Sequence, residues 1–257
     1  MGFWRGLGKF FGGLVFTLAL VGAILAMELV SFSSYENVKT VIGAVLDQQF
    51  SSLTSDQLQQ LHTNLAFQCL TRATISLPLY EGLDAITLSC NDVSSSNNEQ
   101  LKTLISNAVV DSVYYKKFSC SYIDCVTSGN QQDILIAFAD EGNQFYKSAQ
   151  TWLWIVAAIG LAIMLASIET WTGRLKSTGF TLAMTGLPFL FVSQIKSLLP
   201  PIPAQVQGTI VPIIDNLISS LSSRFIIVLV VGVALLAAGF GLEFYLRKSG
   251  KLKTKKK

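Results

Sequence analysis

The chain contains four apolar runs that are each about as long as a lipid bilayer is thick, at about 10–32, 151–171, 177–198 and 225–246. A helix that rises 1.5 Å per residue needs about 20 residues to cross roughly 30 Å of hydrocarbon. Charged residues make up 14% of the 257 residues, whereas an ordinary soluble domain carries about 25%. The runs therefore predict an integral membrane protein.

The third run is the least regular, because Pro188 interrupts it. Polar residues follow the proline near the end of the run, and such residues within a span mark a kink, a cavity or a pore. The candidates for lining a pore are Ser193, Gln194 and Lys196.

Basic residues beside the runs predict the orientation, since Lys and Arg collect at cytoplasmic ends of spans. They form three clusters: Arg5 and Lys9; Arg174 and Lys176; and Arg247, Lys248, Lys251, Lys253, Lys255, Lys256 and Lys257. Four crossings place all three clusters on one side, whereas three or five do not. The segment 33–149 carries twelve Asp or Glu against six Lys or Arg, which is net negative by six and favours the outside.

We therefore expect an all-α membrane protein: a four-helix transmembrane bundle with a mainly helical, disulfide-bonded extracellular domain between the first and second spans. The expected layout is a cytoplasmic interfacial segment (1–9), first span (10–32), extracellular domain (33–150), second span (151–171), cytoplasmic loop (172–176), third span (177–198), short extracellular Pro-rich and amphipathic loop (199–224), fourth span (225–246) and basic cytoplasmic tail (247–257). The protein is thus predicted to be a multi-pass protein of the plasma membrane with both termini in the cytoplasm.

A cleaved signal peptide is the alternative interpretation of the first run, because Arg5 and Lys9 precede it and Ser31-Phe32-Ser33 is a small-x-small triplet. The apolar stretch is longer than a signal-peptide core of 7 to 15 residues. Its length favours a retained span.

All four cysteines lie in the predicted extracellular domain, at Cys69, Cys90, Cys120 and Cys125. An even number of cysteines in an oxidising compartment predicts two disulfides. Of three possible pairings we favour Cys69 with Cys90 and Cys120 with Cys125. A four-cysteine zinc site is the alternative, but the paired Cys-x-x-Cys motifs that such sites use are absent. No cofactor or metal is expected.

Two capping-box patterns in the same domain, at Thr54–Gln57 and Ser96–Glu99, precede apolar residues at helical spacing. They predict the starts of two amphipathic helices. Between them, 74–89 is rich in β-branched residues and contains Pro78 and Gly82, which predicts an extended hairpin.

No catalytic motif is recognisable in the sequence, and an enzyme is not expected. The single histidine, His62, lies in a polar stretch and is interpreted as a solvated surface residue. Four charged residues lie within or beside the runs, which makes each a hypothesis of function; they are Glu28, Glu169, Lys196 and Glu243. Because each is near the end of a run, a structural role is favoured over an ion pathway.

Small residues recur at about four-residue intervals in two runs, and such rows allow helices to approach closely. They are Ala158, Ala162 and Ala166 in the second run and Ala234, Ala238 and Gly241 in the fourth. They predict packing either within the bundle or between subunits. The tail residues Lys253, Lys255, Lys256 and Lys257 are expected to attract anionic lipid headgroups, and nucleic acid is not an expected partner.

A four-span chain with a large first outer loop resembles claudin-like proteins and some gap-junction-type channels in topology. The claudin signature of Trp, Gly-Leu-Trp, Cys and Cys is absent, as is the Cys-Cys-Gly of tetraspanins. The resemblance therefore assigns no family.

These features favour a non-enzymatic cell-surface scaffold that associates with the bilayer and either with copies of itself or with another membrane or envelope protein. An oligomeric large-pore channel and an accessory subunit of a larger membrane complex are the alternatives.

Overall fold

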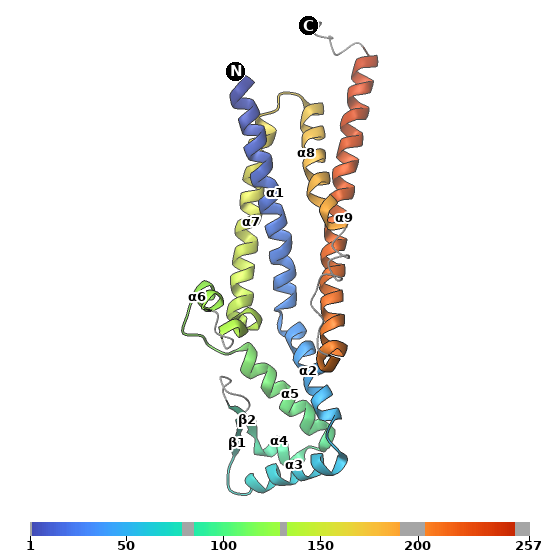
Figure 1. The fold of residues 1–257 in the computed structure, drawn as a ribbon. Helices are drawn as coiled ribbons and strands as arrows, with labels where there is room; N and C mark the ends of the chain where they lie inside the picture. Colours follow the sequence, from blue (N-terminus) through green and yellow to red (C-terminus); the bar gives the residue numbers. More distant parts are fainter. Residues whose placement is uncertain (1, 79–84, 129–132, 191–203, 250–257) are drawn as a thin grey trace. The chain divides into compact units, whose positions relative to one another are not determined.

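The computed structural model describes residues 2–78, 85–128, 133–190 and 204–249. Its helices and strands are α1 (Gly2–Phe32), α2 (Tyr35–Ser51), α3 (Ser55–Gln68), β1 (Thr74–Leu77), β2 (Ile86–Ser89), α4 (Cys90–Ser95), α5 (Asn98–Tyr114), α6 (Tyr122–Thr127), η1 (Asp133–Phe138), α7 (Asp140–Ala166), α8 (Trp171–Gly186) and α9 (Ala204–Lys248) (Figure 1). Contacts divide the chain into a bundle unit (1–28, 147–202 and 214–257) and a cross-linked unit (29–146 and 203–213).

Three helices within the described residues are long and apolar enough to cross a membrane: α1 from Arg5, α7, and α9 from Asp215. They agree with the first, second and fourth predicted spans and support a membrane protein, although α7 begins at Asp140 instead of 151. Large apolar side chains on these helices are exposed, among them Leu18, Ile159 and Val230. In a bilayer, such side chains face lipid.

The helix in the region of the third predicted span differs from the prediction. Helix α8 begins at Trp171, so the expected loop at 172–176 is helical and the turn after α7 lies at 167–170. The helix has 16 residues, about 24 Å at 1.5 Å each, and ends just before Pro188, which has no N–H to continue the helical ladder. The last residues of this predicted span, 191–198, lie outside the described part of the chain.

Helices α1 and α7 meet through glycines that bring their backbones together. A Cβ added to Gly12 would lie 2.7 Å from the backbone nitrogen of Met164, and one added to Gly160 would lie 2.7 Å from that of Phe16. Contacts along the pair join Gly8 with Ser167, Gly12 with Met164, Gly160 with Phe16, and Gly22 with Leu153. Because the α7 numbers fall as the α1 numbers rise, the two helices are antiparallel.

Helices α8 and α9 also meet through glycines that bring their backbones together. A Cβ on Gly232 would lie 2.5 Å from the backbone nitrogen of Ala183, and one on Gly179 would lie 2.6 Å from that of Leu236. Contacts join Gly239 with Lys176, Gly179 with Leu236, Gly232 with Ala183, and Gly186 with Phe225. This pair is also antiparallel, and only residues without a side chain permit so close an approach.

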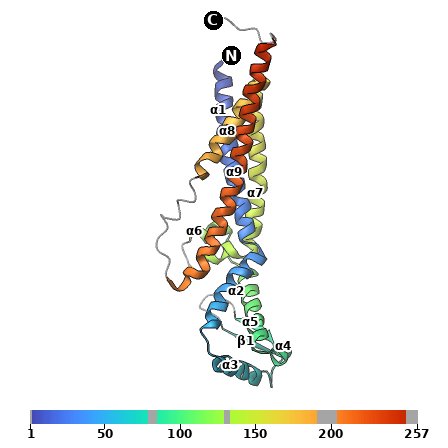
Figure 2. The ribbon, with the colours of Figure 1, turned by 90° about the vertical axis from the view of Figure 1, so that its right-hand side faces the viewer.

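The two pairs share one apolar core in the bundle unit. Its buried residues are Phe16, Ala19, Leu20 and Ile24 of α1, Ala157 of α7 and Phe225 of α9. Leu182 of α8 packs against this core, and the Phe189 ring stacks on Phe225 with 3.4 Å between centroids. Figures 1 and 2 show α1, α7, α8 and α9 side by side along much of their length.

The cross-linked unit has its own core, formed by α2 to α5 and the hairpin. Strands β1 and β2 pair antiparallel, with Thr74 opposite Ser89 and Leu77 opposite Ile86, as the hairpin prediction expected. Helix α2 packs along α5, where the Tyr35 hydroxyl donates a 2.7 Å hydrogen bond to Asp111. This hydrogen bond, and to a smaller extent the loss of water around the hydroxyl, raises the pKa of Tyr35 to about 12.

One of the two predicted capping boxes is in place, and the other is shifted by one residue. Thr54 and Gln57 form the expected box at the start of α3. At α5 the box is Asn97 with Gln100, because the Ser96 hydroxyl donates to the Val93 carbonyl oxygen at the end of α4 instead. A serine that closes one helix is thereby unavailable to open the next.

We predict that Gly232→Leu weakens the α8–α9 contact, because the new side chain must displace the Ala183 backbone. Overpacking of this kind costs about 1 to 3 kcal/mol, or more where backbone must move. Thermal unfolding in detergent should therefore shift downward. Gly241→Leu is the matched control, since nothing lies within 4 Å of a Cβ there and its melting temperature should be unchanged. Equal shifts for both variants would contradict the packing described.

Candidate functional site

One end of the bundle unit gathers ionised side chains from α1, α8 and α9 and from the turn after α7. Arg5 of α1 is paired with Glu169 in the turn after α7. Lys176 of α8 and Arg247 of α9 both pair with Glu243, the second at 2.5 Å. The start of α1, the α7–α8 turn and the last turns of α9 thus lie together, and we call this the basic end.

The basic end keeps an excess of positive charge after these pairs form. Six cations lie on the described residues there, against two carboxylates, Glu169 and Glu243; the cations are Arg5, Lys9, Arg174, Lys176, Arg247 and Lys248. The Lys176 ammonium also lies 4.0 Å from the centre of the Phe240 ring, where the face of an aromatic ring attracts a cation.

The opposite end of the bundle unit holds a buried ion pair that joins α1 to α9. The Glu28 side chain is 7% exposed and is paired with Arg224, whose side chain is 33% exposed. The Ser220 hydroxyl donates a 3.1 Å hydrogen bond to the same carboxylate. A carboxylate this deeply buried requires such a partner, because an unpaired charge in an apolar setting is costly.

A buried polar contact in the cross-linked unit ties the end of α1 to the start of α7. The Asn143 side-chain amide donates to the Val30 carbonyl oxygen and to the Ser33 hydroxyl oxygen, each at 2.9 Å. The Ser33 hydroxyl in turn donates to the Leu29 carbonyl oxygen at 2.7 Å. Both Asn143 and Ser33 are almost fully buried, and these hydrogen bonds satisfy the Asn143 amide nitrogen and the Ser33 hydroxyl.

The two disulfides join the cysteines in the pairing that the sequence favours, Cys69 with Cys90 and Cys120 with Cys125. The first closes 21 residues of chain around the hairpin, and a loop of that length contributes about 3 kcal/mol by restricting the unfolded chain. No free cysteine remains.

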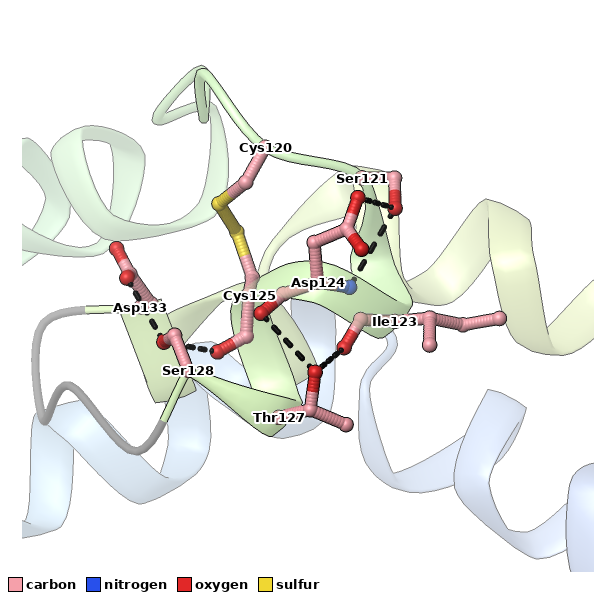
Figure 3. Close-up of a disulfide and its surroundings, with 8 residues drawn as sticks. All are labelled: Cys120, Ser121, Ile123, Asp124, Cys125, Thr127, Ser128 and Asp133. Atoms are coloured by element: carbon pink, nitrogen blue, oxygen red, sulfur yellow. Dashed lines mark hydrogen bonds between the residues drawn. A yellow bond between two sulfur atoms is a disulfide. The ribbon is translucent and has the colours of Figure 1, made fainter.

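Figure 3 shows the second disulfide at the short helix α6, close to Asp133. The two sulfurs and an Asp133 carboxylate oxygen lie within 4.8 Å of one another, a spacing that could suit a metal ion. The sulfurs are bonded to each other, however, and a metal ligand must be a thiolate. The polar groups here form hydrogen bonds at the two ends of α6. The Ser121 side chain caps its start, and the Ser128 hydroxyl donates a 3.1 Å hydrogen bond to the Asp133 carboxylate.

An apolar pocket of about 320 Å³ lies in the cross-linked unit between α2, α5 and η1. Its lining residues are all apolar: Phe32, Val38, Val41, Ile42, Val45, Leu46, Val109, Val113, Leu135 and Phe138. Val45 on its rim is 38% exposed. A pocket with this lining suits an apolar side chain or a hydrocarbon chain.

His62 is placed differently from the prediction of a solvated residue. It is partly buried on α3, and its Nε2 lies 3.1 Å from the Val93 carbonyl oxygen of α4. A carbonyl oxygen can only accept, so Nε2 carries the proton in this hydrogen bond. The single histidine therefore serves to join two helices.

The small-residue rows predicted from the sequence lie on the surface of the bundle unit, not in its helix contacts. Ala158, Ala162 and Ala166 are exposed on α7, as are Ala234, Ala238 and Gly241 on α9. The face of α7 that meets α1 lies one or two residues earlier, at Ala157, Gly160 and Met164. Packing within the bundle is therefore not seen for these six residues, and contact between subunits stays a prediction.

Several predicted site residues lie outside the described part of the chain. They are the pore candidates Ser193, Gln194 and Lys196 and the tail residues Lys253, Lys255, Lys256 and Lys257. Sequence reasoning overlooked Arg224 as the partner of Glu28. Opposite charges at matching ends of the first and fourth predicted spans were the signal that could have identified the pair.

Comparison with protein-family descriptions, characterised proteins and solved structures finds no match to this chain.

We predict that Arg224→Leu destabilises the protein by about 3 kcal/mol, because it leaves the buried Glu28 carboxylate without a cation. Thermal unfolding in detergent measures the loss. The double variant Glu28→Leu/Arg224→Leu should recover most of it, since it removes both charges. Arg247→Leu, at a pair whose arginine is 67% exposed, should cost less than about 1 kcal/mol. A double variant no more stable than Arg224→Leu would mean that the ion pair does not link the helices.

Proposed function

We propose that this chain is a non-enzymatic cell-surface scaffold that crosses the membrane four times and associates with copies of itself through the alanine row of α7. Both termini and the basic end face the cytoplasm, and the cross-linked unit lies outside the cell.

The direction of each helix in the bundle unit supports four crossings. Helix α1 starts at the basic end, and the antiparallel α7 returns to it. Helix α9 also ends there, since Glu243 pairs with Lys176 near the start of α8. The chain after α7 must therefore travel back to the opposite end before α9 begins. We assign this crossing to the part of the chain that begins with α8, whose 16 residues cover much of it.

The charge distribution supports the orientation. The basic end carries six cations against two carboxylates, and Lys and Arg gather on the cytoplasmic side of membranes. The two disulfides belong to the cross-linked unit, and disulfides persist in oxidising compartments outside the cytosol.

The observation that carries self-association is the uncovered alanine row on α7. Ala158, Ala162 and Ala166 stand one helical repeat apart on a face that no helix of the bundle unit covers within the described residues. In lipid there is little hydrophobic drive between helices, so close packing over small residues is what brings them together. The bundle already uses this packing internally, with glycines at Gly12 and Gly160.

The apolar pocket of the cross-linked unit supports binding by that unit as well. Val45 leaves part of this apolar pocket open to water. An apolar group that fills the pocket removes apolar surface from water, which stabilises the complex by about 25 cal/mol per Å² buried. A scaffold with its binding surface outside the cell would keep such a pocket for a side chain of its partner.

We predict that Ala162→Leu weakens self-association about tenfold, because leucine separates the facing backbones. Energy transfer between donor-labelled and acceptor-labelled protein in vesicles, followed as lipid dilutes the protein, measures the change. Ala162→Gly is the control at the same position: it keeps the residue small and should retain association. Because Ala162 is exposed, Ala162→Leu should not change the melting of the single chain. Wild-type protein that stays monomeric at every dilution would contradict the proposal.

A further inference from the structure

A second cavity lies in the bundle unit, between α1 and α8 at the basic end, with a volume of about 700 Å³. Both helices contribute residues at the same spacing: Gly6, Lys9, Phe10, Gly13, Leu14 and Thr17 of α1, and Gly173, Lys176, Ser177, Phe180, Thr181 and Met184 of α8. This spacing of three and four residues defines one face of a helix. The cavity is therefore a groove between two helix faces.

The two faces match in depth because the helices run in the same direction. Helices α1 and α8 both start at the basic end. A Cβ added to Gly13 of α1 would lie 4.0 Å from the Thr181 hydroxyl oxygen of α8. Lys9 and Lys176 each follow the first glycine of their face by three residues. Two ammonium groups therefore stand at one end of the groove, and both come from its own walls.

Away from the lysines the groove is apolar. Phe10 and Leu14 line it from α1, and Phe180 and Met184 line it from α8. Phe10 is 64% exposed and Phe180 is 55% exposed, so neither ring is covered by the bundle. The Thr181 hydroxyl donates to the Ser177 carbonyl oxygen at 2.9 Å, which leaves it little capacity for another donor bond. This part of the groove suits a hydrocarbon chain.

The charges of the groove differ in how they are engaged. Lys176 is paired with Glu243 and faces the Phe240 ring, so its charge is partly compensated. The described part of the chain supplies no partner for Lys9, which is exposed. The surrounding basic end carries six cations against two carboxylates. An occupant must therefore bring an anionic group to Lys9.

We propose that this groove binds an anionic glycerophospholipid, with its phosphate at Lys9 and Lys176 and an acyl chain between Phe10 and Phe180. The charge complementarity of the lysine end and the apolar lining beyond it select one amphiphile over a free anion or a neutral lipid. The inference rests on the proposed orientation, which puts the basic end at the inner leaflet, where anionic lipids concentrate.

Native mass spectrometry of the purified full chain tests this inference. The protein is equilibrated in detergent with equal amounts of dioleoyl phosphatidylglycerol and dioleoyl phosphatidylcholine, and the lipids retained per chain are counted. We expect about fivefold more phosphatidylglycerol than phosphatidylcholine on the wild type, the preference that one basic residue near an anionic headgroup confers. Lys9→Gln should reduce this ratio to about one. Lys248→Gln removes a charge from the same end but outside the groove and should leave the ratio unchanged.

A second pair of variants separates the groove from the surrounding surface. Gly6 lines the groove, and nothing lies within 4 Å of a Cβ added to it, so Gly6→Leu fills groove space without a clash inside the chain. It should therefore lower the number of phosphatidylglycerol molecules retained per chain. Gly241→Leu, equally free of neighbours but outside the groove, should not.

Four results would overturn the inference. Equal retention of both lipids means that the groove does not select charge. An equal loss with Lys9→Gln and Lys248→Gln means a diffuse attraction to the basic end. Competition by water-soluble glycerol phosphate as effective as by the lipid means a free-anion site. If Gly6→Leu instead separates a dimer in the same spectra, a second copy fills the groove. None of these depends on the alanine row of α7, so they leave the test of self-association independent.

Discussion

Close contact between helix backbones is the constraint on which the bundle unit depends. Water drives apolar surfaces together in a soluble core, but lipid is as apolar as the side chains that face it, so packing must hold membrane helices together. Gly12 and Gly160 supply that packing between α1 and α7, and Gly179 and Gly232 supply it between α8 and α9. The two close pairs then bury a common apolar core, in which Phe225 is fully covered.

The ionised groups stand where this packing leaves room for them, at the ends of the helices. The Glu28–Arg224 pair closes one end between α1 and α9, and the pairs of Glu169 and Glu243 close the other. Charges are least costly near the interfaces of a bilayer, where long side chains reach water or headgroups. The positions of the charges and of the apolar runs therefore agree on which part of the bundle lies in the hydrocarbon layer. They also favour a structural role over a path for ions through the membrane.

The sequence predicts the long elements well, because each of the apolar runs that became α1, α7 and α9 exceeds the length of a bilayer crossing. It also predicts the hairpin and the Thr54 cap, whose signals are local. It misplaces the faces of α7 and α9, since Ala158 and Ala157 are equally small and only the position of α1 decides which is covered. Ser96 is predicted to start α5, but its hydroxyl bonds to the end of α4, and the local sequence fits either role. The groove at Lys9 is not predictable either, because it requires two helices far apart in sequence to lie in register.

In the proposed topology the chain crosses the membrane four times, with the α7–α8 turn and the end of α9 on the same side. Because all native cysteines are bonded, single new thiols can be introduced at Ser95, Thr170 and Ser249 and labelled with a membrane-impermeant maleimide on intact cells. We expect Ser95→Cys to be labelled on intact cells, whereas Thr170→Cys and Ser249→Cys should be labelled only after the cells are permeabilised. Labelling of Ser249→Cys but not of Thr170→Cys on intact cells would contradict this topology, because α9 would then be the single crossing between the two positions.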